Sequence, residues 1–445
     1  MSRVAELTSD ALCGFLQRQR WFGGKARAIA EARVVAEGPL DRRSVLTIVA
    51  VRFADGGEER YFVPLMLSRD GLAVDALTDD QACRSLVERI EPGAGRLKIR
   101  RTHADQSNTS IVIGDELILK VFRRVEPGLN PDVEISRFLT ARGFSRVPAL
   151  VADADYVIDA GAACSVLMLQ RFVPNQGNAW NAMIHETAAM PPIALAERLG
   201  RRTGELHETL ASDAGDSAFA PEPYSRAPLD ALAGRIRAYG AKQLELLRSC
   251  ALDGSVRTLA RRVLDREDDL LARFDAIRDV PHPGSRIRCH GDYHLGQTLV
   301  ADGDVFILDF EGEPARSLAE RRTKGSPLRD VAGMLRSFDY AAKASGRGRA
   351  WERDVTDAFL DGYRAATRHA DFLPSFDGSF ETMLEAFVVE KALYELGYEL
   401  NNRPNWVELP LDALARLEWR QSTTWPSSPS ADPRIHSGSA PSRTE

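Results

Sequence analysis

The chain has 445 residues, of which 44% are apolar and 27% charged, a composition typical of globular proteins and unlike collagen-like or wholly disordered chains. At roughly 100–150 residues per domain, this length predicts about three structural units. The net charge of −6 gives no reason to expect nucleic acid or an anionic membrane as a partner. Five cysteines without a C-x-x-C pair, and no apolar stretch near the ~20 residues of a membrane span, favour a cytoplasmic protein.

Residues 1–92 are predicted to form a small α+β unit. A short helix-like segment runs from Ala11 to Arg20. Strand-like runs follow at Arg33–Ala36, Val45–Val51 and Tyr61–Leu65, with a turn signal at Asp55-Gly56-Gly57.

Residues 93–175 continue as a β-rich lobe. Two apolar runs, Ser110–Ile113 and Glu116–Phe122, flank Gly114-Asp115 and predict a hairpin. Apolar residues at helical spacing between Asp132 and Arg142, with Gly143 just beyond, predict a helix. A buried strand is expected at Ser165–Leu169.

Residues 176–420 are predicted to be mainly helical, and residues 421–445, rich in Ser, Thr and Pro, to be a disordered tail. Helical periodicity is seen at Ile193–Leu210, Leu229–Leu247, Val256–Ile277, Leu328–Ala344, Trp351–Thr367 and Phe380–Leu400. One hairpin interrupts it, with strands at Gln297–Ala301 and Val305–Asp309 around Asp302-Gly303. The expected layout is therefore bilobal, with a cleft between a β-rich and a helical lobe.

The densest polar cluster is Cys289-His-Gly-Asp-Tyr-His-Leu-Gly-Gln297, followed by Asp309-Phe-Glu-Gly-Glu-Pro314. Asp292 lies five residues before Gln297, the spacing between the catalytic Asp and the metal-binding Asn of protein kinases. Asp309 ends a strand and precedes Phe310, as in the D-F-G motif. This spacing predicts phosphoryl transfer, with Asp292 accepting the proton of the acceptor hydroxyl and with Gln297 and Asp309 holding Mg²⁺.

A cation for the nucleotide phosphates is expected at Lys120, which interrupts an apolar strand. Glu134, in the next helix, is the predicted counter-charge, as in the strand-Lys/helix-Glu pair of kinases. On its own, a strand lysine is more often a snorkelling edge residue. It is the chain order of Lys120, Glu134, Asp292, Gln297 and Asp309 that favours a kinase-like ATP site.

The remaining contacts to ATP are expected from a phosphate loop without glycine and from the end of a strand. Hydroxyl, amide and backbone N–H groups would surround the phosphates in that loop. The residues expected to bind ATP in this way are Ser107, Asn108, Thr109, Ser110, Gln170 and Phe172.

His290 and His294 could suggest a zinc site, but Gly291 weakens the helix that this spacing requires, and no glutamate lies where the H-E-x-x-H motif needs one. We expect His290 to support the loop through hydrogen bonds. His294 is expected to orient the loop or to touch the acceptor.

The sequence resembles bacterial maltokinases, in the superfamily of eukaryotic-like kinases and aminoglycoside phosphotransferases. The resemblance lies in the polar cluster 289–297, in the run 309–314, and in Arg20-Trp-Phe-Gly-Gly-Lys25, Leu119-Lys-Val-Phe-Arg-Arg124 and Glu390-Lys-Ala-Leu-Tyr-Glu-Leu-Gly-Tyr398. The resemblance spans about residues 10–420. It implies an α+β, protein-kinase-like fold with an N-terminal cap at 1–92, an N-lobe at 93–175 and a helical C-lobe at 176–420.

The resemblance also implies an activity. It is the Mg²⁺-dependent transfer of a phosphoryl group from ATP to the anomeric hydroxyl of maltose, giving maltose 1-phosphate for glycogen or α-glucan synthesis. A trehalose-synthase-type enzyme is then a candidate partner.

A saccharide site is expected on the helix Phe380–Leu400, where Lys391, Tyr394 and Tyr398 share one face. The pattern alone fits a core helix equally well, and the resemblance implies that this face lines the maltose pocket. Glu311, two residues after Asp309, is expected to position the acceptor or the metal.

Two other functions stay open. A glucosamine kinase, or another small-sugar or aminoglycoside phosphotransferase, would share the catalytic loop. A catalytically idle nucleotide-binding module would have a different purpose, although such proteins usually lack one of the residues named above. The aromatic pair Trp21-Phe22 is expected to dock the first unit on its neighbour rather than to bind a ligand.

Overall fold

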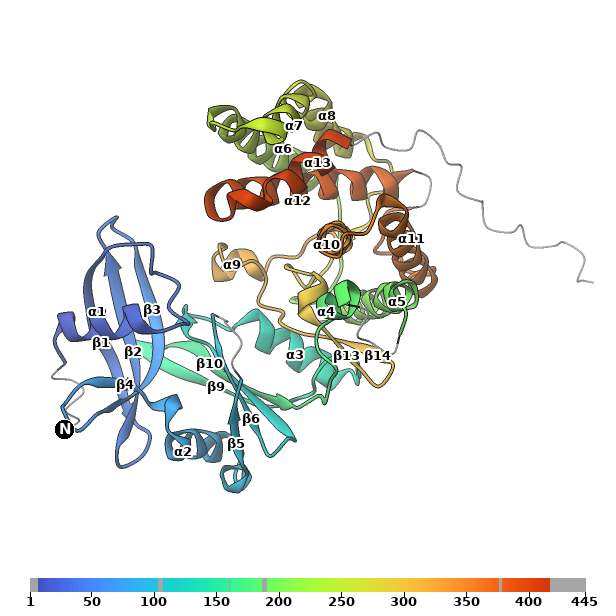
Figure 1. Ribbon diagram of the computed structural model, residues 1–445. Coiled ribbons are helices and arrows are strands. Elements are labelled where there is room, and N and C mark those ends of the chain that lie inside the picture. Colours follow the sequence, from blue (N-terminus) through green and yellow to red (C-terminus); the bar gives the residue numbers. More distant parts are fainter. Residues whose placement is uncertain (1–6, 103–106, 160, 186–189, 376–377, 417–445) are drawn as a thin grey trace, which may run out of the picture.

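The computed structural model describes residues 7–102, 107–159, 161–185, 190–375 and 378–416, and it has a β-rich first part and a helical second part (Figure 1). This agrees with the predicted α+β layout. The predicted disordered tail at 421–445 lies outside the described residues, and the unit boundaries at 92/93 and 175/176 stay predictions. In the part of the chain that is described, no helix has the apolar length that a bilayer crossing requires.

A five-stranded antiparallel sheet forms the first layer, in the order β1-β2-β3-β4 with β8 paired to β3. Thr8 caps the preceding helix, and the apolar face of that helix packs Leu12, Phe15 and Leu16 against the sheet core. The bounds are α1 Ser9–Arg18, β1 Ile29–Pro39, β2 Ser44–Phe53, β3 Glu58–Leu67, β4 Ala73–Asp75 and β8 Arg124–Val125.

A second five-stranded sheet has the order β5-β6-β7-β10-β9 and packs against α3. The predicted hairpin is β6–β7, and its three-residue loop begins with Gly114 and Asp115, whose φ angles of 61° and 57° lie in the left-handed region. Strand β9 was not predicted, because its alternating aspartates resemble a polar loop. The bounds are α2 Asp80–Ile90, β5 Ile99–Arg101, β6 Thr109–Ile113, β7 Leu117–Val121, α3 Pro131–Ala141, β9 Leu150–Asp159 and β10 Ala162–Arg171.

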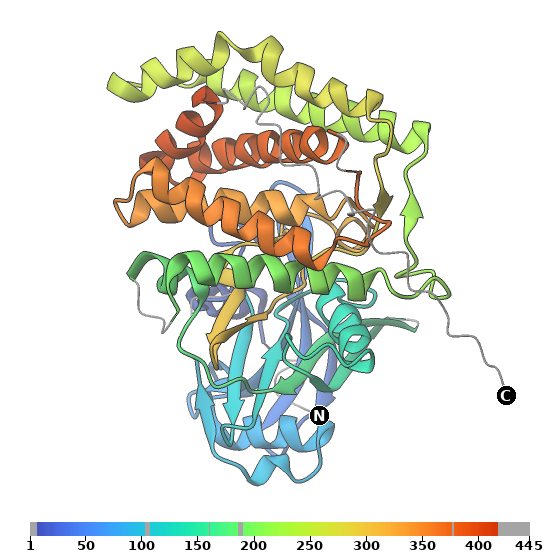
Figure 2. The same cartoon turned by 90° about the vertical axis from the view of Figure 1, so that its right-hand side faces the viewer.

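The helices of the second part stack in layers above the sheets (Figure 2). The predicted single helix at Val256–Ile277 is wrong, because the chain leaves the helical conformation at Arg266 (φ −112°, ψ 16°). The bounds are α4 Ala179–His185, α5 Pro192–Leu210, β11 Glu222–Pro223, α6 Arg226–Ser249, α7 Gly254–Leu264, α8 Glu267–Ala276, β12 Ser285–Arg286, α10 Leu328–Ala344, α11 Arg349–Ala366, α12 Ser379–Asn402 and α13 Glu408–Arg416.

The lobes meet at the hairpin β13–β14 (Thr298–Ala301 and Asp304–Ile307) and at the short helix α9 (Leu318–Arg321) that follows it (Figure 1). Glu126, which follows β8, accepts a hydrogen bond from the Leu318 backbone at 3.1 Å and pairs with Arg321 at 3.2 Å. Residues 309–318 therefore run between the two lobes.

Candidate active site

The loop that carries Asp292 is held by buried hydrogen bonds on both sides. His290 is buried, and its Nε2 lies 2.8 Å from the carbonyl oxygen of Leu308, next to Asp309. The supporting role predicted for His290 is confirmed. Gly291 has a φ of 87°, in the left-handed region that favours glycine. The chain thus turns sharply just before Asp292.

Asp330, at the start of α10, anchors the same loop and was not singled out in the sequence. Its carboxylate accepts the backbone N–H groups of His290 at 2.7 Å and Gly291 at 3.0 Å, and His207 Nε2 lies 3.1 Å away. Burial would raise the pKa of Asp330, but the hydrogen bond from His207 lowers it below its usual value. The only sequence signal was an acid within a helix of mostly apolar residues, Leu328 to Phe338.

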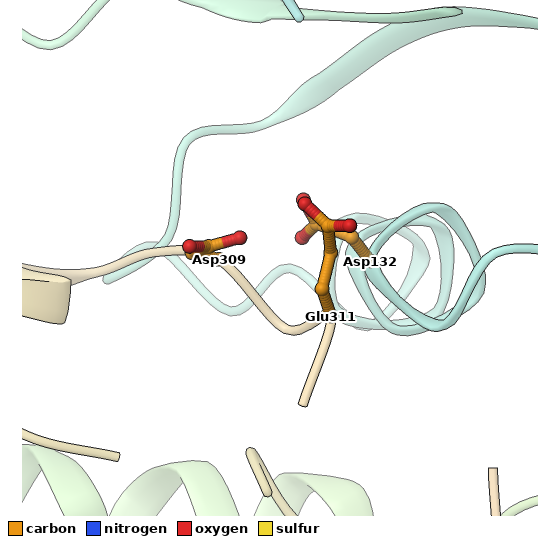
Figure 3. A group of neighbouring side chains, drawn as sticks. All are labelled: Asp132, Asp309 and Glu311. Atoms are coloured by element: carbon orange, nitrogen blue, oxygen red, sulfur yellow. The ribbon is translucent and has the colours of Figure 1, made fainter. Parts of the chain in front are cut away.

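Lys120 lies among three carboxylates from two lobes. Its Nζ is 2.7 Å from Asp132, 2.6 Å from Asp309 and 2.7 Å from Glu311. The carboxylates of Asp132, at the start of α3, and of Asp309 and Glu311, after β14, point toward a common space (Figure 3). Although burial opposes it, the three carboxylates raise the pKa of Lys120 above its usual value. Burial would raise the pKa of Asp309, yet Lys120 lowers it to about 2.

The predicted pairing of Lys120 with Glu134 is wrong. Glu134 is 2.6 Å from Arg322 and 2.9 Å from Arg288, both in the helical lobe. Asn130 caps α3 and Pro131 opens it, which places Asp132 in the first turn, facing Lys120. Glu134, two residues later, is rotated by about 200° around the helix axis.

The carboxylate cluster fits a magnesium ion. Asp132, Asp309 and Glu311 each offer an oxygen, and these atoms lie within 4.8 Å of one another. Gln297 joins them, because its Nε2 donates to Asp309 at 3.0 Å. Carboxylate and amide oxygens are the hard ligands that Mg²⁺ selects. Glu311 therefore lies beside Lys120, which is predicted to bind ATP.

The predicted phosphate loop contributes one side chain to this cluster. Asn108 Nδ2 donates to Glu311 at 2.5 Å. The Thr109 hydroxyl accepts from Arg123 at 2.8 Å, Ser107 is exposed, and Ser110 lies opposite Lys120 in the β6–β7 ladder.

Gln170 and Phe172 lie at the end of β10, but their side chains are not part of the Lys120 cluster. Gln170 Nε2 is 3.4 Å from the Ser136 hydroxyl and 3.2 Å from the Pro148 carbonyl oxygen. The Phe172 ring lies 5.7 Å from the guanidinium of Arg100.

A second polar cluster joins Asp292 to α12. Lys391 Nζ is 3.4 Å from Asp292 and 3.4 Å from Glu313, and 4.6 Å from the centre of the Tyr394 ring. Burial opposes protonation, but Asp292 and Glu313 raise the pKa of Lys391 above its usual value. Tyr398 is 45% exposed at the end of the same face. Glu313 was quoted within its motif but was not predicted as a site residue.

His294 caps the short turn at Leu295–Gln297, and its Nδ1 accepts from the Gly296 N–H at 3.0 Å. Burial lowers the pKa of His294, with Asp292 opposing the shift. His294 is therefore a neutral hydrogen-bond acceptor at pH 7.

We predict that His294→Asn weakens the pH dependence of stability below about pH 6.5. The pKa of this histidine is lower in the folded state than in the unfolded state, where it is about 6.5, so its protonation favours unfolding. The free energy of unfolding is therefore highest above pH 6.5 and falls below it, by at most about 1.4 kcal/mol per pH unit. Asn keeps an acceptor for the Gly296 N–H, as a good helix cap. Thermal unfolding at a series of pH values measures the difference, and parallel curves for the two proteins would contradict the prediction.

Comparisons with known proteins add to this geometry. A model of a phosphotransferase enzyme family matches residues 98–374, and a model of the maltokinase N-terminal cap domain matches residues 15–82. A glucosamine kinase from Streptacidiphilus jiangxiensis is 25% identical, over 85% of this chain and 91% of that protein. Another, from Mycolicibacterium smegmatis, is 24% identical, over 70% of this chain and 78% of its own length.

A solved structure described as glucosamine kinase in complex with glucosamine, ADP and inorganic phosphate has a TM-score of 0.69 at 21% identity. It covers 93% of this chain, and this chain covers 98% of it. The likeness confirms the predicted kinase-like fold.

Proposed function

Because this chain belongs to the phosphotransferase enzyme family, we propose that it is a maltose kinase, which transfers the γ-phosphoryl group of ATP to the anomeric hydroxyl of maltose. The products are maltose 1-phosphate and ADP, and the sugar phosphate feeds glycogen or α-glucan synthesis. A trehalose-synthase-type enzyme, as a source of maltose, is a partner within this proposal.

The observation that carries the choice of sugar is an aromatic surface that leads away from Asp292 along α12. From Lys391 to Tyr398 the helix rises by about 10 Å, which exceeds a single hexose ring. Tyr394 and Tyr398 lie along this face, and Tyr340 and Trp406 stack nearby, with ring centres 6.2 Å apart. Aromatic faces bind the apolar faces of sugar rings, and their hydroxyls bind sugar hydroxyls. A disaccharide uses this length better than a monosaccharide.

Charge at the acceptor side favours a neutral sugar. The charges of Asp292 and Glu313 are compensated by two cations, Lys391 at 3.4 Å from each and Arg316 at 2.6 Å from Glu313. The ammonium group of an amino sugar would meet this lysine, and like charges repel. A hydroxyl group of a neutral sugar can instead bind either carboxylate.

The proposed mechanism uses the residues of both clusters. Asp292 accepts the proton of the anomeric hydroxyl as the oxygen forms its bond to the γ-phosphorus and the bond from that phosphorus to the bridging oxygen of ADP breaks. Lys120 binds the α- and β-phosphates, and Lys391 keeps Asp292 in place. Mg²⁺, for which Asp309, Gln297 and Glu311 offer ligands, would neutralise charge on the phosphates.

The test is ADP formation with maltose, glucosamine, glucose and kanamycin side by side, with the position of the phosphate in the product found by NMR. We expect maltose to give the highest turnover and its phosphate to lie at C1. Nucleotide binding without ADP release on any sugar would favour the idle module instead.

A second candidate is a glucosamine kinase, because both curated relatives described above carry that name at 25% and 24% identity. Faster turnover on glucosamine than on maltose would establish it and overturn the maltose proposal.

We predict that Glu313→Gln raises the KM for the sugar by about tenfold and leaves the KM for ATP within about twofold, because its charge-assisted contacts to Lys391 and Arg316 are lost on the acceptor side only. Steady-state kinetics with each substrate varied in turn measures both constants. Glu245→Gln, at an exposed glutamate that pairs with Arg248 far along α6, is the matched control. An equal rise of both KM values would contradict the prediction.

A further inference from the structure

Arg123 is a fully buried arginine that joins the two sheets. It lies between β7 and β8, is 1% exposed, and its Nη2 lies 2.5 Å from Asp75 at the end of β4. Asp75 also accepts the indole N–H of Trp21 at 3.1 Å, and the Arg123 guanidinium lies 4.5 Å from the centre of that indole. Trp21 and Asp75 fall in the region that matches the cap-domain model, and Arg123 in the region that matches the phosphotransferase model.

The other side of Arg123 holds the phosphate loop. Its Nε donates to the Thr109 hydroxyl at 2.8 Å, and its backbone N–H donates to the Asn108 amide oxygen at 3.3 Å. The Asn108 amide nitrogen in turn donates to Glu311, which pairs with Lys120. A continuous series of contacts therefore runs from Trp21, between α1 and β1, to the residues around Lys120.

Stability alone is a poor explanation for this arrangement. Burying an ion pair costs desolvation energy, and apolar residues of similar size often hold two elements together as well or better. Arg123 Nη1 has no hydrogen-bond partner among the described residues, so even the buried guanidinium is incompletely satisfied. What an apolar pair could not supply is a donor for the Thr109 hydroxyl.

We propose that Trp21, Asp75 and Arg123 are positioning residues that hold Asn108 and Thr109 in the conformation that receives the nucleotide phosphates. The proposal rests on the proposed function, because it takes the segment 107–110 as the phosphate loop. Asp75 and Trp21 fix the guanidinium, the guanidinium fixes the Thr109 side chain, and the loop enters the cleft already ordered. Ordering before binding lowers the entropy cost that nucleotide binding would otherwise carry.

The first variant is Asp75→Asn, which removes the charge and keeps the shape. We expect the KM for MgATP and the Kd for MgADP to rise by about tenfold, the effect of losing one charge-assisted hydrogen bond, while the KM for maltose stays within about twofold. Isothermal titration with MgADP gives the Kd without any dependence on the sugar. Glu31→Gln is the control, because Glu31 forms an exposed ion pair with Arg52 in the same sheet.

The second variant, D75L/R123M, separates positioning from stability. Replacing both charges with apolar side chains leaves no buried charge unpaired, so we expect a thermal midpoint above that of Asp75→Asn, which leaves the Arg123 guanidinium without its counter-charge. The midpoint should stay below that of the wild type, because the N–H groups of Trp21 and Leu77 lose their acceptor. The KM for MgATP should nevertheless stay about tenfold raised, because R123M removes the donor of the Thr109 hydroxyl. A purely structural pair would instead regain nucleotide affinity together with stability, and that result would overturn the proposal.

The outcomes also separate this proposal from the proposed function. If the wild type does not bind MgADP, the phosphotransferase assignment of the site fails. If the wild type binds MgADP and D75L/R123M binds it equally well, only the positioning role fails. Hydrogen exchange of the amides at 107–113 provides a second readout, in which we expect faster exchange in both variants and no change in Glu31→Gln.

Discussion

Asp292→Asn lowers turnover by about 10³-fold and leaves the affinity for MgADP within about twofold, because the lost carboxylate is the proposed proton acceptor and takes no part in the Lys120 cluster. Asn keeps the shape of the side chain and can still accept a hydrogen bond from Lys391, which lies 3.4 Å from Asp292. Binding and turnover should therefore separate in this variant. Single-turnover kinetics and isothermal titration measure the two quantities independently.

Asp302→Asn is the matched control for this change. Asp302 lies in the β13–β14 turn of the same lobe with a φ of 52°, a conformation that Asn adopts readily. Unchanged turnover is expected. Near-normal turnover in Asp292→Asn would rule out Asp292 as the base and would require another proton acceptor near the anomeric hydroxyl.

Asp330→Ala should lower the free energy of unfolding by about 3–5 kcal/mol, because it leaves two buried backbone N–H groups and His207 without their acceptor. Turnover should fall as well, since the same N–H groups belong to His290 and Gly291, next to Asp292. Urea denaturation monitored by circular dichroism gives the change in stability.

Asp41→Ala provides the comparison for that measurement. Asp41 also accepts two backbone N–H groups, from Arg43 and Ser44, each at 2.8 Å, but its turn is partly exposed to water. Water can replace the lost acceptor there, so we expect a loss of only about 1 kcal/mol. Similar losses in the two variants would show that Asp330 is not a buried anchor.

Elements defined by nearby residues were predictable from the sequence. The hairpin around Gly114 and Asp115 has its turn residues next to its strands, and the structure confirms it. Periodicity located α10 and α12 within two residues of their observed ends, because amphipathic helices of this length repeat their pattern several times. Strand β9 escaped prediction, because the aspartates at Asp153, Asp155 and Asp159 make the segment as polar as a loop.

The pairing of Lys120 depended on the phase of a helix. A shift of two residues decides whether Asp132 or Glu134 faces β7, and the deciding signal is Asn130-Pro131, which sets the first turn of α3. Kinase-like spacing alone favoured the wrong acid. The Asn130-Pro131 helix start indicates instead that Asp132 lies in the first turn of α3.

The anchors of the site could not be predicted from spacing at all. Asp330 meets His290 across 40 positions of sequence, and Arg123 meets Asp75 across 48. Such contacts depend on how whole elements pack. A single sequence gives no signal for which of many acids in a chain of 445 residues will lie beside a given buried donor.

Strand β8 has a consequence for how the protein is made. The chain builds most of its first sheet by Asp75, then forms β5, β6 and β7 of the second, and only afterwards adds Arg124–Val125 to β3. On the ribosome the first sheet thus stays incomplete until much of the second has emerged. The two sheets should therefore fold as one cooperative unit, and a graft of residues 1–92 onto another protein would lack the strand Arg124–Val125 that completes the first sheet.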